Sequence, residues 1–228
     1  MHLAKPCLDI GLATNRIADM LGFWQDKVGL PLDHVLPIAR GQKQYRHDLL
    51  GSVLKINAYY EALPEAPPSG YDELLIAREG VGAPLRLNDP DGNPVTLVAP
   101  GEFGIQQIGI KLKVSNIEAH ARFYRDALGL DDVSRNGLAA FQAGSTRLLL
   151  EHSADAAIDT PIRAKGWRYI TFQVFKVDVE HARAVALGAR EAMKPTTLGT
   201  TARISMLCDP DGNWIEISQR ASLTGSLA

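Results

Sequence analysis

The sequence predicts an α+β fold in which tandem βαβββ units form two modules, with a degenerate second unit. Three observations support this prediction. Of the 228 residues, 46% are hydrophobic, which is enough to give two small domains a packed core. An apolar strand followed by a helix that ends in Gly-Leu occurs twice, and so does the turn sequence DPDGN. Because the two signals recur in the same order, the chain is an internal repeat.

The spacing of the two signals measures the repeat. Asp9–Leu30 aligns with Gly109–Leu130 at an offset of 100 residues (129 minus 29 for the shared glycine). The DPDGN sequence stands at 89–93 and again at 209–213, an offset of 120 residues (209 minus 89). An apolar segment that can form a strand follows each copy, since Pro and Gly in DPDGN favour a tight hairpin turn.

These signals divide the chain into an N-terminal module over residues 1–101, a C-terminal module over 105–221 and a tail over 222–228. A joint containing Pro and Gly separates the modules. At the start of the second unit the offset is only 96 (169 minus 73), so 24 residues are missing there (120 minus 96). We therefore expect no helix between the strands predicted at Leu74–Arg78 and Leu85–Asn88.

The C-terminal module shows the individual elements most clearly. Alternating residues predict a strand over Ile108–Val114, and Ser115 or Asn116 can cap the helix that follows. Gly129 suits the left-handed residue at the end of this helix. Further strands are predicted near Asp131–Ser134 and over Gly137–Phe141, Thr146–His152, Tyr169–Phe175, Ala189–Lys194, Ala202–Cys208 and Trp214–Ser218, with a second helix over Val179–Leu187. The N-terminal module repeats the first of these units within Leu8–Tyr60.

Composition excludes several classes of function. The 24 Lys and Arg against 26 Asp and Glu give a net charge of -2 with no long basic run, so nucleic acid is not an expected partner. No apolar stretch approaches the roughly 20 residues of a membrane helix, and no signal peptide is expected. Cys7 and Cys208 form no disulfide framework. We expect a cytoplasmic protein with a small-molecule ligand, which could form a homodimer.

The repeated motifs resemble those of the vicinal oxygen chelate superfamily. The residues that carry the resemblance are FYRDALGL at 123–130 and DPDGNWIEI at 209–217. This superfamily includes glyoxalase I, the type I extradiol dioxygenases and the bleomycin-resistance proteins. The resemblance covers nearly the whole chain and implies two half-barrel modules, with metal ligands on the first and last strands of the units.

Most of the metal ligands that the resemblance implies are missing. The first strand of the third unit offers Gly109, the first strand of the fourth offers Tyr169 in place of His, and the last strand of the fourth offers Glu216. The matching positions of the first module are Asp9, about Ile56, Glu73 and Thr96. Since a metal site needs three or four protein ligands, we expect no metal and no cofactor; Fe, Mn or Zn would require ligands at shifted positions.

Glu216 is the strongest candidate for chemistry. A lone carboxylate inside a barrel costs several kcal/mol unless a metal, a proton, open water or an arginine neutralises it. The arginines considered are Arg147, Arg168 and Arg203. We assign Glu216 as a general base and Tyr169 as a donor of a phenol hydrogen bond into the same space. The structural alternative is that Glu216 is a relic with a structural partner.

Three more residues are assigned to substrate binding in the C-terminal module, between its two units. These are Gln173, Glu151 and His152. His47 could also reach a pocket, whereas His120 and His181 lie among polar neighbours on predicted helices and are expected to face solvent.

Three functions remain open. The first is an enzyme of lyase or isomerase type, or a dioxygenase-like enzyme with a divergent site, that acts on a small aromatic or oxygenated metabolite with Glu216 as base. The second is a non-catalytic protein that sequesters its ligand, as the resemblance to the bleomycin-binding branch implies. The third is a metal enzyme of glyoxalase or dioxygenase type with shifted ligands.

Overall fold

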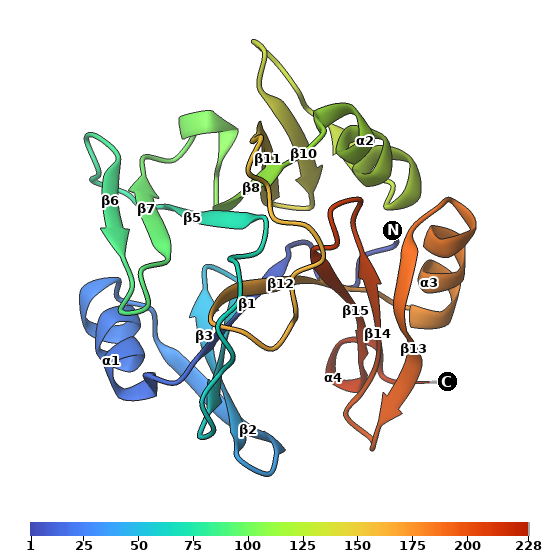
Figure 1. Ribbon diagram of the computed structural model, residues 1–228, viewed down its shortest axis with the longest axis horizontal. Coiled ribbons are helices and arrows are strands. Elements are labelled where there is room, and N and C mark those ends of the chain that lie inside the picture. The colour runs from blue at the N-terminus through green and yellow to red at the C-terminus, as the bar shows by residue number, and fades with distance from the viewer. Residues whose placement is uncertain (228) are drawn as a thin grey trace.

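Four strand-rich units follow one another in the computed structural model, which describes residues 1–227 (Figure 1). The first unit consists of β1 (Asp9–Thr14), α1 (Ile17–Leu21), β2 (Leu32–Ala39), β3 (Gln42–Leu49) and β4 (Ser52–Tyr59). The second consists of β5 (Tyr71–Ala77), β6 (Leu85–Asn88) and β7 (Pro94–Val98). The predicted degenerate unit is thus confirmed: no helix lies between β5 and β6 in this described part of the chain.

The third and fourth units have the complete βαβββ order. The third consists of β8 (Ile108–Val114), α2 (Ile117–Arg122), β9 (Asp131–Asp132), β10 (Ala139–Ala143) and β11 (Thr146–His152). The fourth consists of β12 (Gly166–Gln173), α3 (Val177–Ala186), β13 (Arg190–Leu198), β14 (Ala202–Cys208) and β15 (Trp214–Arg220), followed by the short α4 (Ala221–Thr224). Both α1 and α2 continue as π-helical turns, over Gly22–Lys27 and Phe123–Ala127. None of the helices within residues 1–227 is long and apolar enough to cross a membrane.

The strand order corrects the expected pairing of the units. We expected consecutive units to pair, but one sheet runs β13-β14-β15-β12-β1-β4-β3-β2 and the other β6-β7-β5-β8-β11-β10-β9. The first unit therefore pairs with the fourth through antiparallel β1 and β12, and the second pairs with the third through β5 and β8. Figure 1 shows the blue strands of the first unit beside the orange and red strands of the fourth. A repeat in the sequence shows that the units exist. It does not show which two units pair through their first strands.

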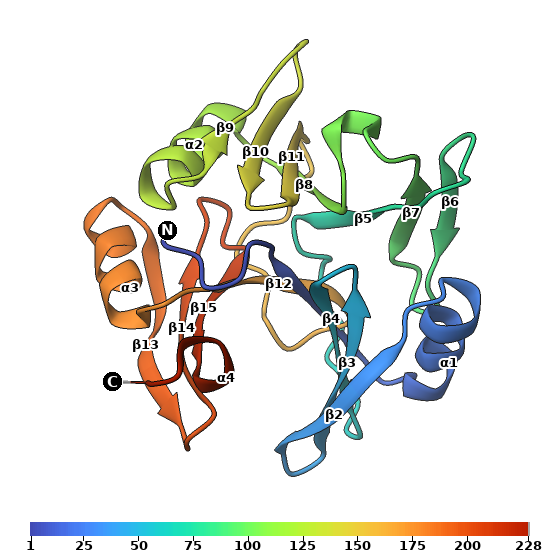
Figure 2. The same cartoon turned by 180° about the vertical axis from the view of Figure 1, so that it is seen from behind.

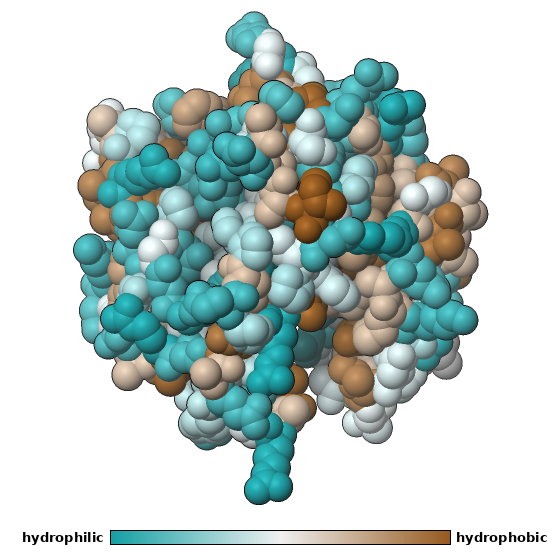
Figure 3. Space-filling view, in the orientation of Figure 1, coloured by the Kyte–Doolittle hydropathy of each residue, from teal (hydrophilic) through white to brown (hydrophobic). Residues whose placement is uncertain are grey.

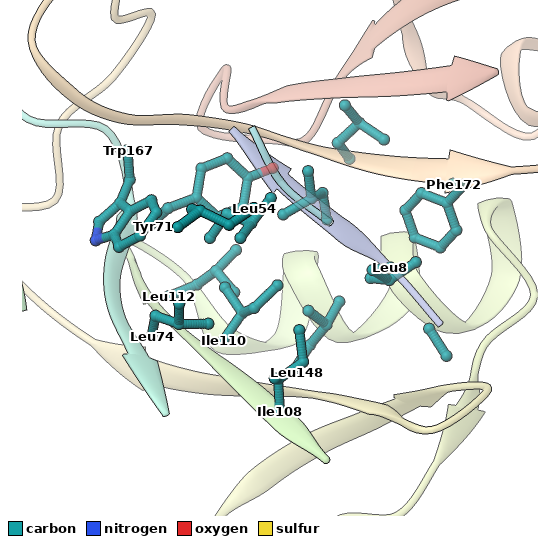
Figure 4. Close-up of a cluster of buried hydrophobic side chains, with 14 of the residues drawn as sticks. Leu8, Leu54, Tyr71, Leu74, Ile108, Ile110, Leu112, Leu148, Trp167 and Phe172 are labelled. Carbon is teal, nitrogen blue, oxygen red and sulfur yellow. The ribbon is translucent and has the colours of Figure 1, made fainter. Parts of the chain in front are cut away.

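Each curved sheet is a half-barrel, and the two pack against each other through their convex faces. One hydrophobic core includes Leu54 and Phe172 from the first sheet and Ile110 and Leu148 from the second (Figure 4). The N-terminal segment lies between the sheets and bonds to both (Figure 2). The Ala4 amide donates to the Gln173 carbonyl over 2.9 Å, and the Ser145 amide donates to the Pro6 carbonyl over 2.8 Å. The concave faces are left pointing away from the shared core.

Local signals position the helices as predicted. Asn116 is the cap of α2, because its side chain accepts a hydrogen bond from the Ala119 amide at 2.9 Å. Gly129 follows with a φ of 68°, the left-handed conformation expected there. In the second DPDGN turn, the Asp209 carboxylate accepts from the Asp211 and Asn213 amides at 3.0 and 2.8 Å.

The expectation that His120 and His181 face solvent is wrong. His120 is fully buried beneath the second DPDGN turn, with Nε2 3.5 Å from carboxylate oxygens of both Asp209 and Asp211. Burial alone would lower its pKa, but the hydrogen bond and charge of Asp209 raise the pKa of His120 above its usual value. His181 is also buried, and its Nε2 lies 2.8 Å from a Glu191 oxygen. Both histidines stabilise contacts between elements.

His47 lies on β3, on the face opposite to the concave side of its half-barrel. It is fully buried, with Nε2 3.3 Å from the amide nitrogen of Gln25, and burial lowers its pKa to about 4. The folded protein therefore holds His47 neutral in a pH range where the unfolded chain, with a pKa near 6.5, takes up a proton.

We predict that His47 makes the fold sensitive to acid. The unfolded state binds more protons than the folded state between about pH 6.5 and 4, so the free energy of unfolding falls as the pH falls through this range, by roughly 3 kcal/mol in total. Urea titrations of the wild type and His47→Gln at several pH values measure the difference. The exposed His34→Gln is the control. Parallel pH profiles for wild type and His47→Gln would contradict this account.

Candidate functional site

A cavity of about 230 Å³ opens on the concave face of the first half-barrel. Its polar lining comprises Gln44, Lys55, Asn57, Tyr169, Glu216, Ser218 and Arg220, and its apolar lining includes Ile38, Ile162, Leu198, Ile204 and Met206. Figure 3 shows the surface hollowed below the centre of the view, with brown apolar side chains at the edge of the hollow. A pocket with apolar walls and a few polar groups is typical of small-molecule sites.

Strand alternation places the polar side chains on this face. Along β12, Ile170 and Phe172 enter the shared core, so Tyr169 and Thr171 point to the concave side. Thr171 is paired with Glu216 on the parallel strand β15. Because the sheet curls, residues of the first unit complete the same site from β1, β3 and β4.

Gly11 on β1 makes room for the Tyr169 ring. It is paired with both Tyr169 and Lys55 on the neighbouring strands. A methyl group at Gly11 would lie 2.3 Å from carbon atoms of the Tyr169 ring, closer than any real contact. Gly11 therefore carries no donor of its own and instead makes space for an aromatic ring on the concave face.

A buried ion pair occupies the centre of the concave face. The Lys55 ammonium donates to Glu216 Oε1 at 3.0 Å and to Thr171 Oγ1 at 2.6 Å. Only 2% of the Lys55 side chain is exposed, against 15% for Glu216. Burial lowers the pKa of Lys55 below its usual value, although the charges of Glu216 and Asp9 oppose the shift. Lys55 is thus the partner that neutralises Glu216, and none of the three arginines considered from the sequence does so.

Tyr169 is held as a neutral phenol. Its hydroxyl oxygen accepts hydrogen bonds from the side-chain amides of Asn57 and Gln44, at 3.2 and 3.3 Å. Burial raises the pKa of Tyr169 far above the usual phenol value, and the charge of Glu216 adds to the shift. Its own hydroxyl hydrogen therefore remains available to a ligand oxygen in the cavity.

The donors on this face do not fit a divalent metal. Glu216 is the one carboxylate of the cavity lining, and a lysine ammonium already binds it. Asp9 lies deeper and bonds to Lys5 at 2.6 Å and to Gln173 at 3.0 Å. Within residues 1–227, no group of three or more His, Cys, Asp and Glu side chains could hold a metal ion. A metal centre also needs open coordination positions, which a bound ammonium would block.

The second half-barrel has a related ion pair, which lies beside an apolar cluster. Glu73 accepts hydrogen bonds from Lys111 at 2.7 Å and from Thr96 at 2.5 Å. Beside this group, an apolar cluster of Leu75, Ala77, Val98, Ile105, Ala140 and Leu149 packs on the same side of the sheet. A methyl group at Gly109 would lie 2.4 Å from Ile105 Cδ1. Apolar side chains therefore fill the space beside the pair of Lys111 and Glu73. The cavity of about 330 Å³ on this sheet is lined by Phe103, Leu138 and Arg147 among others and does not include the pair.

The structure brings together some of the residues assigned from sequence and separates others. Glu216 and Tyr169 line one cavity, as proposed. Gln173 shares their strand face but bonds to Asp9 away from the cavity lining. Glu151 and His152 lie on β11 of the other sheet and are exposed, so the structure does not place them with Glu216.

The cavity also lies elsewhere than expected. We placed it between the third and fourth units, but the first and fourth units form it, because β12 pairs with β1 and not with β8. The same pairing puts Gly109 in the other half-barrel, so Gly109, Tyr169 and Glu216 do not form one triplet.

Lys55 is the main residue that sequence reasoning missed. The resemblance pointed to a position at about Ile56. Ile56 is fully buried in the shared core, and its neighbour Lys55 faces the cavity. The signal that could have identified Lys55 is a charged residue in the middle of the strand sequence SVLKINAY. A strand that is covered on both faces is expected to carry apolar residues at such positions.

Comparison with known proteins agrees with this architecture. Residues 104–217 match the family model of the Glyoxalase/Bleomycin resistance protein/Dioxygenase superfamily. A glyoxalase I variant from Zea mays superposes with a TM-score of 0.76 at 14% identity, over 100% of this chain and 96% of that one. A proposed dioxygenase from Bacillus subtilis subsp. subtilis str. 168 gives a TM-score of 0.69 at 12% identity, over 96% and 85%. No curated protein sequence matches significantly. At these identities the superpositions show the fold.

We predict strong energetic coupling between Lys55 and Glu216. Lys55→Met leaves a buried carboxylate without its cation and should lower the free energy of unfolding by about 3–5 kcal/mol. The double variant Lys55→Met with Glu216→Gln should lose less than the sum of the single losses, by about 1–3 kcal/mol. Urea unfolding followed by tryptophan fluorescence measures all four proteins.

The second half-barrel supplies a matched control for this cycle. The side chain of Lys111 is 30% exposed, so water screens its pair with Glu73 and the coupling between Lys111→Met and Glu73→Gln should be smaller. Equal coupling energies in the two half-barrels would show that burial does not control the strength of the Lys55 pair.

We predict that the protein does not require a divalent metal to bind its ligand. Elemental analysis of protein purified without added metal should find no stoichiometric iron, manganese or zinc, and chelation should leave ligand affinity unchanged. Stoichiometric metal that disappears in Glu216→Ala would contradict this prediction and restore the metal-enzyme hypothesis.

Proposed function

We propose that this chain, which belongs to the Glyoxalase/Bleomycin resistance protein/Dioxygenase superfamily, binds a small oxygenated or aromatic metabolite in the first half-barrel and catalyses proton transfer there. One observation carries the proposal: Glu216, Tyr169 and Lys55 meet at the same open cavity, whereas the cavity of the second half-barrel is not lined by its own ion pair, Lys111 and Glu73. The reaction class is that of a lyase or isomerase that removes a proton next to a carbonyl group.

The contacts give each residue a role in such a reaction. Glu216 accepts a hydrogen bond from Lys55 and is partly open to the cavity, so it is the general base. Tyr169 donates its hydroxyl hydrogen to the ligand oxygen, where negative charge develops as the proton leaves. The Lys55 ammonium supplies a fixed positive charge that favours this anionic state. No change of oxidation state is needed, since the proton moves between the ligand and the protein.

A second candidate function is sequestration without chemistry. The observation that favours it is that the polar groups of the cavity satisfy one another. Lys55 bonds to Glu216 and Thr171, and Tyr169 accepts two amide hydrogen bonds. In this hypothesis the same network is a rigid floor beneath a bound ligand, and the apolar lining supplies the affinity.

Glu216→Gln distinguishes the two functions. The amide can still accept a hydrogen bond from Lys55 but cannot take a proton, so turnover should fall by about 100-fold or more while binding persists. If the protein only sequesters its ligand, no turnover is seen and the affinity should change by at most roughly 1–2 kcal/mol. Calorimetric titration and NMR of a panel of aromatic and oxygenated metabolites provide both readouts, including exchange of ligand protons with D₂O.

Glu151→Gln is the matched control, because Glu151 is an exposed carboxylate on the other sheet. It should leave both binding and turnover unchanged. If neither the wild type nor Glu216→Gln binds any member of the panel while circular dichroism shows both to be folded, the proposed site is wrong.

A further inference from the structure

Two guanidinium groups stand at the cavity without an acidic partner. Arg46 on β3 shares a strand face with Gln44, which lines the cavity. Arg220 at the end of β15 shares a face with Glu216 and Ser218, and it lines the cavity directly. The curl of the sheet brings these two arginines, from units at opposite ends of the chain, to the same concave face.

The hydrogen bonds of these arginines are incomplete. Arg46 is only 5% exposed, and its side chain makes one hydrogen bond, from Nη1 to Gln44 Oε1 at 2.8 Å. The Nε atoms of both Arg46 and Arg220 are buried and have no hydrogen-bond partner. In the described residues no carboxylate lies within 4.0 Å of either guanidinium, although buried charges are normally paired.

The charges around the cavity do not balance. Lys55, Arg168 and Arg220 in the lining and Arg46 beside it are four cations, while Glu216 is the single carboxylate of the lining and is already bound to Lys55. Asp9, the next nearest carboxylate, is held by Lys5. Burial lowers the pKa of Arg46, and the charge of Arg220 lowers it further, which shows that the two cations lie close enough to repel each other.

Arg168, the other arginine of the cavity lining, has the hydrogen-bond partners that Arg46 and Arg220 lack. Arg168 Nε donates to the carbonyls of Ala164 and Lys165, both at 2.9 Å, and its other nitrogens donate to further carbonyls. Its charge is therefore used to hold the loop before β12. Arg46 and Arg220 have no such structural use, so their free donors point to a ligand.

We propose that the ligand of this cavity is a small organic anion whose carboxylate or phosphate group is bound by Arg220 and Arg46. An anionic oxygen group would accept the unused guanidinium hydrogens and separate the two positive charges. The apolar part of the same molecule would contact Ile204 and Met206. This inference rests on the proposed ligand cavity and adds the charge of the ligand to it.

Isothermal titration with matched pairs of probes tests the proposal. Benzoate is compared with benzamide, and phenyl phosphate with benzyl alcohol, at low and at moderate salt. At least one anion should bind the wild type 10-fold or more tightly than its neutral counterpart, and its affinity should fall with added NaCl because salt screens the charges. Inorganic phosphate should compete with it.

Arg220→Gln is the main variant, because Arg220 lies at the end of β15 and is less buried than Arg46. It should remove most of the preference for the anion and leave the affinity for the neutral probe unchanged. Arg46→Lys, which keeps the charge but not the fork of donors, should weaken the preference less. Arg203→Gln on the adjacent β14 is the control, since Arg203 binds Asp178 away from the cavity.

The outcomes separate this inference from the proposed function. Equal binding of a neutral probe and its anion, or an anion preference unchanged in Arg220→Gln, would overturn the inference and leave the cavity in place. Failure of all four probes to bind folded wild-type protein at millimolar concentration would overturn both.

Discussion

The ion pair between Lys55 and Glu216 is the constraint on which the first half-barrel depends. An ammonium and a carboxylate are buried together at the centre of a concave face, 161 residues apart in the chain. Taking both charges out of water is costly, and their mutual attraction offsets the cost only if the geometry and the remaining hydrogen bonds are good. Thr171 supplies one such bond to Lys55. The pair is therefore compatible only with a fold that brings β4 and β15 onto one curved sheet.

That requirement explains why the pairing of units matters more than their order in the chain. β1 and β12 join the first unit to the fourth, and this junction places Lys55, Tyr169 and Glu216 around one cavity. Had consecutive units paired, Glu216 would share a sheet with Gly109, Lys111 and Leu149 and would not meet Lys55. The convex faces of both sheets then form one continuous core, which fixes the curvature of each half-barrel.

The sequence was sufficient for the fold class and the four units, but not for the pairing of the units, and it pointed to two residues of the cavity lining. Repeated helix ends and DPDGN turns predicted the four units and the missing helix, because such signals act within a few residues of the chain. Tyr169 and Glu216 followed from their places on strands of the fourth unit. Lys55 was not predicted, because the resemblance pointed to a position at about Ile56. A shift of one residue along a strand moves the side chain to the other face of the sheet. His120 was misplaced for a similar reason, since its burial depends on a turn 89 residues away (209 minus 120).

The two half-barrels share a backbone arrangement but differ in the polar side chains on their concave faces. Each has a lysine bonded to a glutamate on its concave face, Lys55 to Glu216 and Lys111 to Glu73. In the first a threonine accepts from the lysine, and in the second a threonine donates to the glutamate. In the second half-barrel Ile105 and its neighbours pack beside the pair, and the cavity of that sheet is lined by other residues. In the first half-barrel the space stays open and two further arginines face it.

The Lys55 ammonium lies at the centre of the concave face. The resemblance to the vicinal oxygen chelate superfamily had implied a metal ion at such a position. Because a lysine cation is covalently attached, it cannot dissociate as a metal does, and only protonation can remove its charge. The proposed proton transfer at this site should therefore respond to pH and to the charge of the ligand, and not to the supply of metal ions.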